Sequence, residues 1–344
     1  MPKGQKRLFS ERKPVVTVVT PVFNEEEGLD HYFATVERVL FTQTEVEWKI
    51  LLVDDGSADQ SWSIVQAQCA KDRRFEGLRL SRNFGSHSAL SAGLNHAEGD
   101  AVTILAADLQ DPAEVVLQFV EQWLAGYDIV WGKRISRKES WLRSQASTQF
   151  ANLARRHAMP KGSRFTTGSF LLMDRKVLAC YRAFPEKRRI TFALVAWTGF
   201  DQQVVAYHRK AREFGTSGWT LSRMLQAFYD TFIGFSNLPL RLMSFLGVAT
   251  ALFSVVIAIY VIANWLFTDV VPGWTAIMLG ISFFFSIVFF ILGMMTEYLH
   301  RIHQEVLGRP VYFISEQTDD YPPQNAADPA KVELQKNRKT QGRG

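Results

Sequence analysis

Apolar and polar residues divide this 344-residue chain into two parts of different character. Up to about residue 240, short apolar runs alternate with segments in which apolar positions recur at helical spacing. The apolar runs fall at residues 15–20, 49–53, 77–80, 101–105 and 127–131. The helical patterns fall between them, at residues 25–40, 61–71, 88–97 and 113–125. Apolar strands that alternate with helices predict an α/β fold whose mostly parallel sheet is covered on both faces.

The second part of the chain is almost free of charge. Between Arg241 and Glu297 the only charged residue is Asp269. Two apolar runs, at about 242–267 and 272–298, each exceed the roughly 20 residues that cross a bilayer as a helix. Together they form residues 242–299, which we predict to be a hairpin of two transmembrane helices.

Charges around this hairpin predict its orientation. Arg241 precedes the first run and Arg301 follows the second, whereas the connection 268–273 has no Lys or Arg. By the positive-inside rule, both chain ends then lie in the cytoplasm. We therefore expect a multi-pass protein of the cytoplasmic (inner) membrane.

The segment just before the hairpin, residues 219–241, carries apolar residues at near-helical spacing. It is either a helix that faces the core or one that lies in the membrane interface. Its position next to the hairpin favours the interface.

Charge and cysteine content narrow the partners. The formal net charge of +5 indicates an acidic partner, and the apolar second part favours phospholipid headgroups or a phosphorylated substrate over nucleic acid. Cys69 and Cys180 lie far apart and have no histidine pattern beside them, so we expect neither disulfides nor zinc. The basic arm 1–14 precedes an apolar run too short for a signal peptide, so the first domain is expected in the cytoplasm.

Polar residues follow each predicted strand, at residues 21–25, 54–57, 81–85 and 106–112. Ligands of open α/β sheets bind at the carboxyl ends of the strands, so these loops predict one crevice. Its carboxylates and arginine suit a nucleotide diphosphate with a divalent cation, because a carboxylate can hold Mg²⁺ or Mn²⁺ together with phosphate oxygens. Asp55 can accept hydrogen bonds from a base, and Arg82 can offset phosphate charge. Asp108 and Asp111 have a second interpretation, as caps of the helix that starts near Pro112.

The ordered set of motifs resembles the family 2 glycosyltransferases, and more narrowly the polyprenyl-phosphate glycosyltransferases (GtrB-like enzymes and dolichol-phosphate mannose synthase). The matching blocks are PVFNEE at 21–26, DDGS at 54–57, RNFG at 82–85, AGLNHAEGD at 92–100 and AADLQDP at 106–112. Later blocks are GKR at 132–134, GSFLLMDR at 168–175, YHRKAREFG at 207–215 and FSNLPLR at 235–241. The resemblance runs from about residue 15 to residue 309.

This resemblance implies a GT-A (Rossmann-like) catalytic domain over residues 15–218 and the inverting transfer of one sugar from a nucleotide sugar. UDP-sugars are favoured as donors, and the acceptor would be polyprenyl (undecaprenyl) phosphate. The lipid phosphate, already anionic near neutral pH, would attack the anomeric carbon, so a strong protein base is less necessary. The resemblance also suggests a homotetramer.

The resemblance assigns roles to individual residues. Nucleotide contacts are expected from Pro21, Phe23, Glu25, Asp55, Arg82 and Ala107. The metal ligands would be Asp108 and Gln110. Catalytic roles fall to Asp108, Arg134, Arg209 and Arg212, and acceptor-phosphate contacts to Arg134, Ser169, Ser217 and Trp219.

Three positions depart from the family pattern. Ala106 replaces the first Asp of D-x-D, Ser169 replaces the Asp of G-D-F, and Gly218 replaces the Lys of G-x-S-K-W. These departures leave open a catalytically degenerate membrane scaffold that keeps a sugar-nucleotide site. A processive polysaccharide synthase is the other alternative, but its Q-x-x-R-W motif and additional membrane helices are not found. We expect the cytoplasmic tail, residues 300–344, to be disordered after about residue 317.

Overall fold

The computed structural model describes residues 7, 9, 12–135, 170–186, 189–209, 238–267 and 273–318. Its strands are β1 (Val15–Val22), β2 (Glu47–Asp54), β3 (Phe75–Leu80), β4 (Ala101–Ile104), β5 (Ile129–Arg134), β6 (Leu171–Asp174), β7 (Gln202–Tyr207) and β8 (Ile314–Gln317). Its helices are α1 (Leu29–Val39), α2 (Ser61–Lys71), α3 (Ser86–His96), α4 (Ala113–Leu124), α6 (Arg175–Ala183), α7 (Thr191–Trp197), α9 (Leu238–Phe267) and α10 (Trp274–Leu307).

The described strands form one mixed sheet in the order β7-β5-β6-β4-β1-β2-β3-β8. The central strands β4, β1, β2 and β3 are parallel, whereas β6 and β8 run antiparallel to their neighbours. The chain leaves β1 toward β2 on one side and later returns to β4 on the other. This reversal of strand order lies at the carboxyl end of β1, where open α/β sheets bind their ligands.

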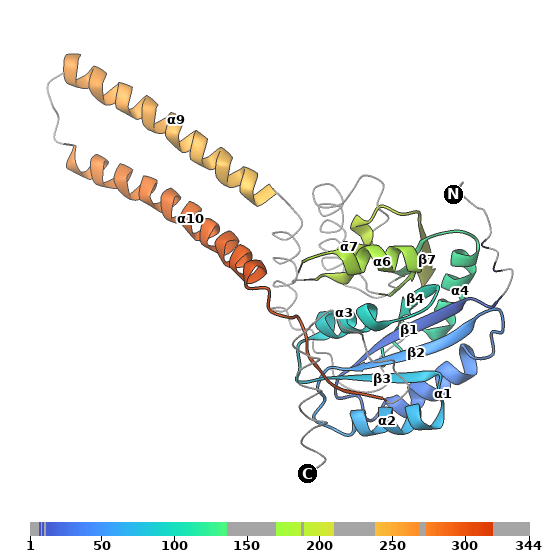
Figure 1. Cartoon of the computed structure of the whole chain (residues 1–344). Helices are drawn as coiled ribbons and strands as arrows, with labels where there is room; N and C mark the ends of the chain where they lie inside the picture. Colours follow the sequence, from blue (N-terminus) through green and yellow to red (C-terminus); the bar gives the residue numbers. More distant parts are fainter. Residues whose placement is uncertain are drawn as a thin grey trace, which may run out of the picture.

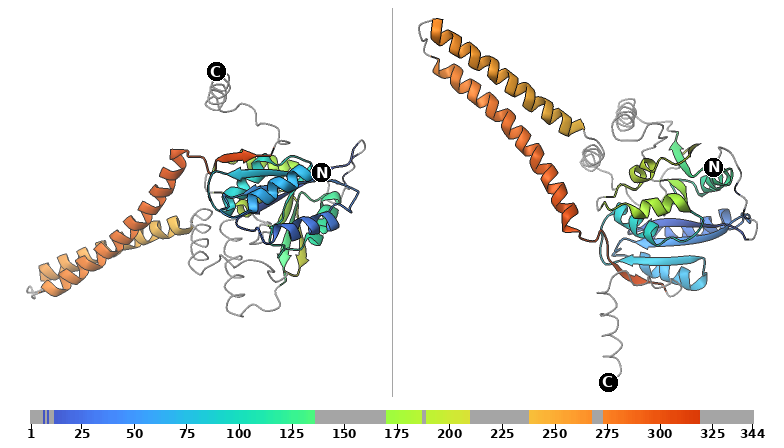
Figure 2. Two further views of the ribbon diagram at one scale, coloured as in Figure 1. Left: turned by 90° about the horizontal axis from the view of Figure 1, so that it is seen from below. Right: turned by 45° about the horizontal axis from the view of Figure 1, so that its top comes forward.

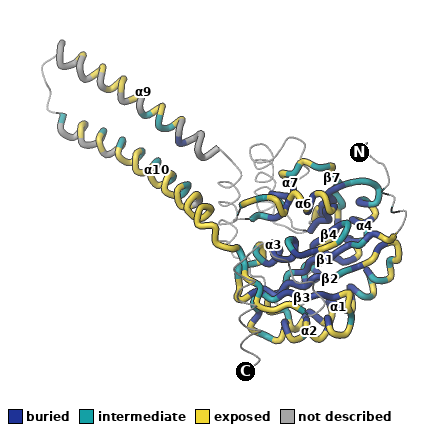
Figure 3. Tube along the Cα trace, in the orientation of Figure 1, coloured by how far each residue is buried: buried dark blue, intermediate teal, exposed yellow. Residues whose placement is uncertain are grey.

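Helices cover both faces of the sheet, as the apolar runs predict (Figure 1). Alternate residues of β1 and β2 point to opposite faces. Val18 and Ile50 pack in the core cluster with α1, α2 and α4. Val19 and Leu51 pack in the second cluster, with α3, α6 and α7. The buried strands between these two layers stand out in Figure 3.

The structure differs from the sequence-based expectation at several element boundaries and in elements that the pattern does not predict. The predicted helix 25–40 begins only at Leu29, because the carbonyl of Glu25 accepts the N–H groups of Gly28 and Leu29 in a turn. Several elements were not predicted from the sequence pattern: β6, β7, α6, α7 and β8. The last of them, β8, is the least expected. Its four residues, ISEQ, form no apolar run, and they join the sheet by pairing with β3.

Helices α9 and α10 project from the sheet domain as an antiparallel pair (Figures 1 and 2). The predicted span at about 242–267 falls within α9, and the one at about 272–298 overlaps α10, which begins at Trp274. Among the described residues, one helical segment, Phe283–Leu307, is long and apolar enough to cross a membrane, and α9 contains the shorter apolar stretch Phe245–Ile257. Large apolar side chains of α10 are exposed, including Phe283, Phe285, Phe289 and Phe290.

The basic N-terminal arm contributes a buried ion cluster to the sheet domain. The guanidinium of Arg7 lies 2.6 Å from Asp128 and 2.6 Å from Asp174, and its Nε donates to the carbonyl of Trp123. Arg7 therefore links its segment by ion pairs to Asp128, just before β5, and to Asp174, just before α6.

We expect Arg7→Met to lower the free energy of unfolding by about 3 kcal/mol, because it leaves two largely buried carboxylates short of a partner. Urea unfolding followed by tryptophan fluorescence measures this change. Arg12→Gln is the matched control, since its exposed pair with Asp100 contributes little. Equal destabilisation by the two variants would contradict the assignment.

Candidate active site

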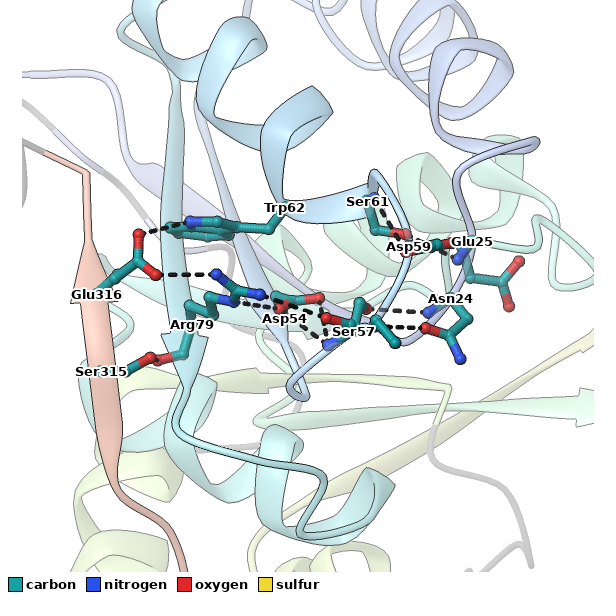
Figure 4. Close-up of polar contacts among 11 residues, drawn as sticks. Asn24, Glu25, Asp54, Ser57, Asp59, Ser61, Trp62, Arg79, Ser315 and Glu316 are labelled. Carbon is teal, nitrogen blue, oxygen red and sulfur yellow. Dashed lines mark hydrogen bonds and ion pairs between the residues drawn. The ribbon is translucent and has the colours of Figure 1, made fainter.

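The loops that follow β1 and β2 are joined by reciprocal hydrogen bonds (Figure 4). The N–H of Asn24 donates to Ser57 Oγ at 3.0 Å, and Asn24 Oδ1 accepts the N–H of Ala58 at 3.0 Å. The N–H of Glu25 donates to Ser61 Oγ at 2.9 Å. Asn24 adopts a left-handed backbone, with φ of 52°, which asparagine tolerates better than most residues. The first two predicted loops therefore form one polar edge.

A buried carboxylate joins the second loop to the third. Asp55 is 3% exposed, and its two oxygens accept the N–H groups of Phe84 and Gly85 at 2.8 and 2.9 Å. Burial raises the pKa of Asp55 above its usual value, and the two amides oppose that shift. Each oxygen retains a second lone pair, so Asp55 can still accept from a ligand.

The close approach of these two loops requires glycine. Gly56 has φ of +68°, and a Cβ there would lie 2.4 Å from the backbone carbon of Arg82. The side chains around this contact are accessible. Arg82 is exposed and lies over the ring of Phe84 at 4.5 Å, and Phe23 is 43% exposed. These groups offer a cation and an aromatic face to a planar, charged ligand.

The loop after β4 contains the predicted metal ligands. Asp108 Oδ1 accepts the N–H of Gln110 at 3.2 Å, and Leu109 between them has φ of 47°. Such a conformation in a bulky residue is strained and is often found at functional sites. Asp108 and Gln110 supply oxygen atoms, the ligands that Mg²⁺ and Mn²⁺ prefer. Among the described residues there is no cluster of three or more His, Cys, Asp or Glu. A metal held by Asp108 and Gln110 can take further ligands from phosphate and water.

Beside this loop lies a second group, of basic residues around one carboxylate. Asp111 accepts a hydrogen bond from the hydroxyl of Tyr207, and its oxygens lie 3.6 Å from both Arg134 and Arg209. Arg134 Nε donates to the same hydroxyl at 3.2 Å. Asp111 is buried, whereas the two arginine side chains are 44% and 40% exposed. The buried carboxylate of Asp111 thus holds both guanidinium groups, which remain accessible to solvent.

Electrostatics favour the charged form of Arg134. Desolvation by itself lowers the pKa of Arg134, but Asp111 and Tyr207 outweigh it, so the pKa is raised. Burial and the neighbouring Asp111 raise the pKa of Tyr207, which keeps its hydroxyl protonated as a donor. The arrangement can receive an anion such as phosphate.

Most predicted site residues are thus brought to the carboxyl edge of the sheet. The loops of Pro21, Phe23, Glu25, Asp55 and Arg82 meet at one end, and Asp108, Gln110, Arg134 and Arg209 gather near α4. Ala107 differs, because its side chain packs in the hydrophobic core and only its backbone can reach a ligand. Arg212, Ser169, Ser217, Gly218 and Trp219 lie outside the described residues.

Sequence reasoning missed several members of the site. The interpretation of Asp111 as a helix cap is wrong: α4 has Pro112 at its N-cap without a side-chain cap, and Asp111 contacts Tyr207 instead. Tyr207 had a signal in the Y-x-R block but was assigned no role. The structural roles of Asn24 and Ser57 became apparent only once their loops were seen together.

An open α/β sheet with polar loops at its carboxyl edge is typical of enzymes that bind nucleotides. Comparison with known proteins agrees, since residues 17–182 match the model of glycosyl transferase family 2. The chain is 36% identical over 303 residues to an uncharacterised glycosyltransferase of Synechocystis sp., covering 88% of this chain and 95% of that one. It is 34% identical over 304 residues to a prophage-derived bactoprenol glucosyl transferase of Shigella flexneri, covering 87% and 97%. The chain belongs to glycosyl transferase family 2 and is a glycosyltransferase.

Among solved structures, the chain is similar to a mannosyltransferase from Pyrobaculum calidifontis in complex with GDP-Man and Mn²⁺. The sequence identity is 20%, the match covers 59% of each chain, and the TM-score is 0.42.

We expect Gly56→Ala to weaken binding of UDP, the nucleotide part of the expected donor, by at least about 10-fold, because the methyl group would push the second and third loops apart. Isothermal titration calorimetry measures the affinity. Gly199→Ala is the matched control, since Gly199 also has a positive φ, of +74°, but has open space at its Cβ. If both variants bind UDP as the wild type does, the close contact between Gly56 and the backbone of Arg82 is not needed for nucleotide binding.

Proposed function

We propose that this glycosyltransferase transfers a single sugar, with inversion, from a UDP-sugar to undecaprenyl phosphate at the cytoplasmic face of the membrane. The observation that carries the proposal is the pairing of two unlike groups at one sheet edge. Asp108 and Gln110 can hold a cation with the donor diphosphate, and Arg134 and Arg209, which lie beside Asp111, suit an anionic acceptor. The name of the Shigella relative supports bactoprenol as acceptor and glucose as the first sugar to test.

The donor half of the site would work through the interlocked loops. Phe23 can stack on the base, Asp55 can accept from it, and Pro21, Glu25 and the backbone of Ala107 line the approach. Arg82 is exposed and can pair with a phosphate. A bound Mg²⁺ or Mn²⁺ would stabilise the negative charge that develops on the departing diphosphate.

The acceptor half would work through the arginines. A lipid phosphate bound by Arg134 and Arg209 presents an anionic oxygen to the sugar, so the protein has to orient this nucleophile rather than deprotonate it. Arg212, Ser169, Ser217 and Trp219 are proposed to complete the acceptor contacts.

The membrane arrangement belongs to the same proposal. We infer a GT-A domain at residues 15–218, which β8 completes, an interfacial segment at 219–241, whose last four residues begin α9, and two membrane spans within α9 and α10, with both chain ends cytoplasmic. The exposed apolar surface of α10 supports this arrangement. A homotetramer stays a prediction.

The transfer is tested with purified protein, undecaprenyl phosphate, a panel of radiolabelled nucleotide sugars that includes UDP-glucose, and Mg²⁺ or Mn²⁺. We expect a chloroform-soluble labelled product. In Asp108→Ala the rate of its formation should fall at least about 100-fold, because the metal that stabilises the negative charge on the departing diphosphate in the transition state is no longer held. Asp72→Ala is the control, a surface carboxylate paired with Arg74.

The alternatives give different results in the same assay. If no donor labels lipid and no nucleotide binds, the degenerate scaffold suggested by Ala106 replaces the proposal. A labelled product longer than one sugar would support a processive synthase.

The acceptor role of the arginine group has its own test. Tyr207→Phe removes the hydroxyl that donates to Asp111 and accepts from Arg134, so Asp111 is freed to draw the arginines inward. We expect the KM for undecaprenyl phosphate to rise about 5- to 10-fold, while UDP affinity stays within about twofold. Steady-state kinetics with each substrate varied separately measures both effects. If UDP affinity falls and the KM for undecaprenyl phosphate is unchanged, the group belongs to the donor site instead.

A further inference from the structure

The chain that leaves α10 returns to the sheet domain and completes it. Helix α10 ends at a left-handed Gly308, with φ of +61°, and β8 begins six residues later, at Ile314. β8 pairs antiparallel with β3, with Arg79 opposite Glu316. Further hydrogen bonds hold the residues on either side of the strand: the N–H of Ser81 donates to the carbonyl of Phe313, and the N–H of Gly77 donates to Thr318 Oγ1. Figure 2 shows this connection from two further directions.

Glu316 of β8 makes two charged or polar contacts with the sheet domain (Figure 4). Its Oε2 accepts Trp62 Nε1–H at 2.9 Å, and its Oε1 accepts an N–H of Arg79 at 2.9 Å. These contacts fix one end of the Arg79 guanidinium, whose side chain is 30% exposed.

The other end of Arg79 holds the Asp-Asp-Gly-Ser loop. Its Nε lies 3.3 Å from the fully buried carboxylate of Asp54, and a terminal N–H donates to the carbonyl of Ser57 at 3.3 Å. Asp54 in turn accepts the N–H of Ser57. Because Ser57 Oγ also accepts from Asn24, the contacts run without a break from β8 to the loop that carries Phe23.

The residues before β8 contact the third loop and its helix. The ring of Phe313 lies 6.3 Å from that of Phe84, whose amide donates to Asp55. The hydroxyl of Tyr312 accepts from Asn95 on α3 at 3.1 Å. The returning segment therefore contacts the third loop and α3 directly, and it reaches the second loop through Arg79.

We propose that β8 is part of the donor site and that Glu316 is a positioning residue: through Arg79 it fixes the 54–57 loop in the geometry that binds the nucleotide. This inference rests on the proposed function, because it assumes that these loops hold the nucleotide. It also implies that the donor site is complete only when the chain has passed through α10 and returned to β3.

The test uses the full-length protein and UDP with Mg²⁺ as the probe. Glu316→Gln can still accept from Trp62 but loses its charge toward Arg79. We expect the Kd for UDP and the KM for UDP-glucose to rise about 5- to 10-fold, the size of a weakened charge-assisted hydrogen bond. The kcat and the KM for undecaprenyl phosphate should stay within about twofold. Arg79→Lys, which keeps a charge but cannot reach three partners at once, should raise the same two constants.

Glu76→Gln is the matched control, since Glu76 lies three residues before Arg79 on β3 and pairs with Lys49 at 3.1 Å, away from the loops. It should leave UDP affinity unchanged. If Glu316→Gln lowers the melting temperature but binds UDP as tightly as Glu76→Gln, β8 is structural only and the inference is wrong. If the wild-type protein binds neither UDP nor UDP-glucose, the proposed function fails and this inference fails with it.

Discussion

The arrangement of the site depends on two adjacent buried carboxylates at the end of β2. Asp54 and Asp55 are 0% and 3% exposed, and burial raises the pKa of each. Two such groups are stable only where donors replace the lost water. The donors are Arg79 and the backbone amides of Ser57, Phe84 and Gly85. Because two of these amides belong to the loop after β3, hydrogen bonding of Asp55 requires that loop to lie against the loop after β2. The arrangement of these loops is therefore set by folding and does not require a ligand.

The sequence predicted the fold where local patterns determine it. Apolar runs of β1 to β5 and the helical patterns between them correspond to observed elements, because strands buried on both faces must be apolar along their whole length. The meeting of the first three polar loops could be predicted as well, since the carboxyl ends of parallel strands share an edge. Its polar motifs, read in order, also identified the family.

What could not be predicted depends on contacts between distant residues. β8 has no apolar pattern, and its place is decided by where the chain returns after α10. Asp111 and Tyr207 are separated by 96 positions, and the proline that follows Asp111 is equally typical of a helix start. Arg79 is an unremarkable basic residue on a strand until Glu316 and Asp54 are seen on either side of it.

β8 has one more consequence, for how this protein behaves toward copies of itself. In an open sheet the outermost strand presents a row of unpaired N–H and C=O groups, which another strand can join. Here β3 would be that strand, and four residues supplied from beyond α10 cover it, with the charged Glu316 in the centre. A chain that ends before Ile314 would leave β3 as the outermost strand on this side of the sheet, with its N–H and C=O groups open to pairing with another strand.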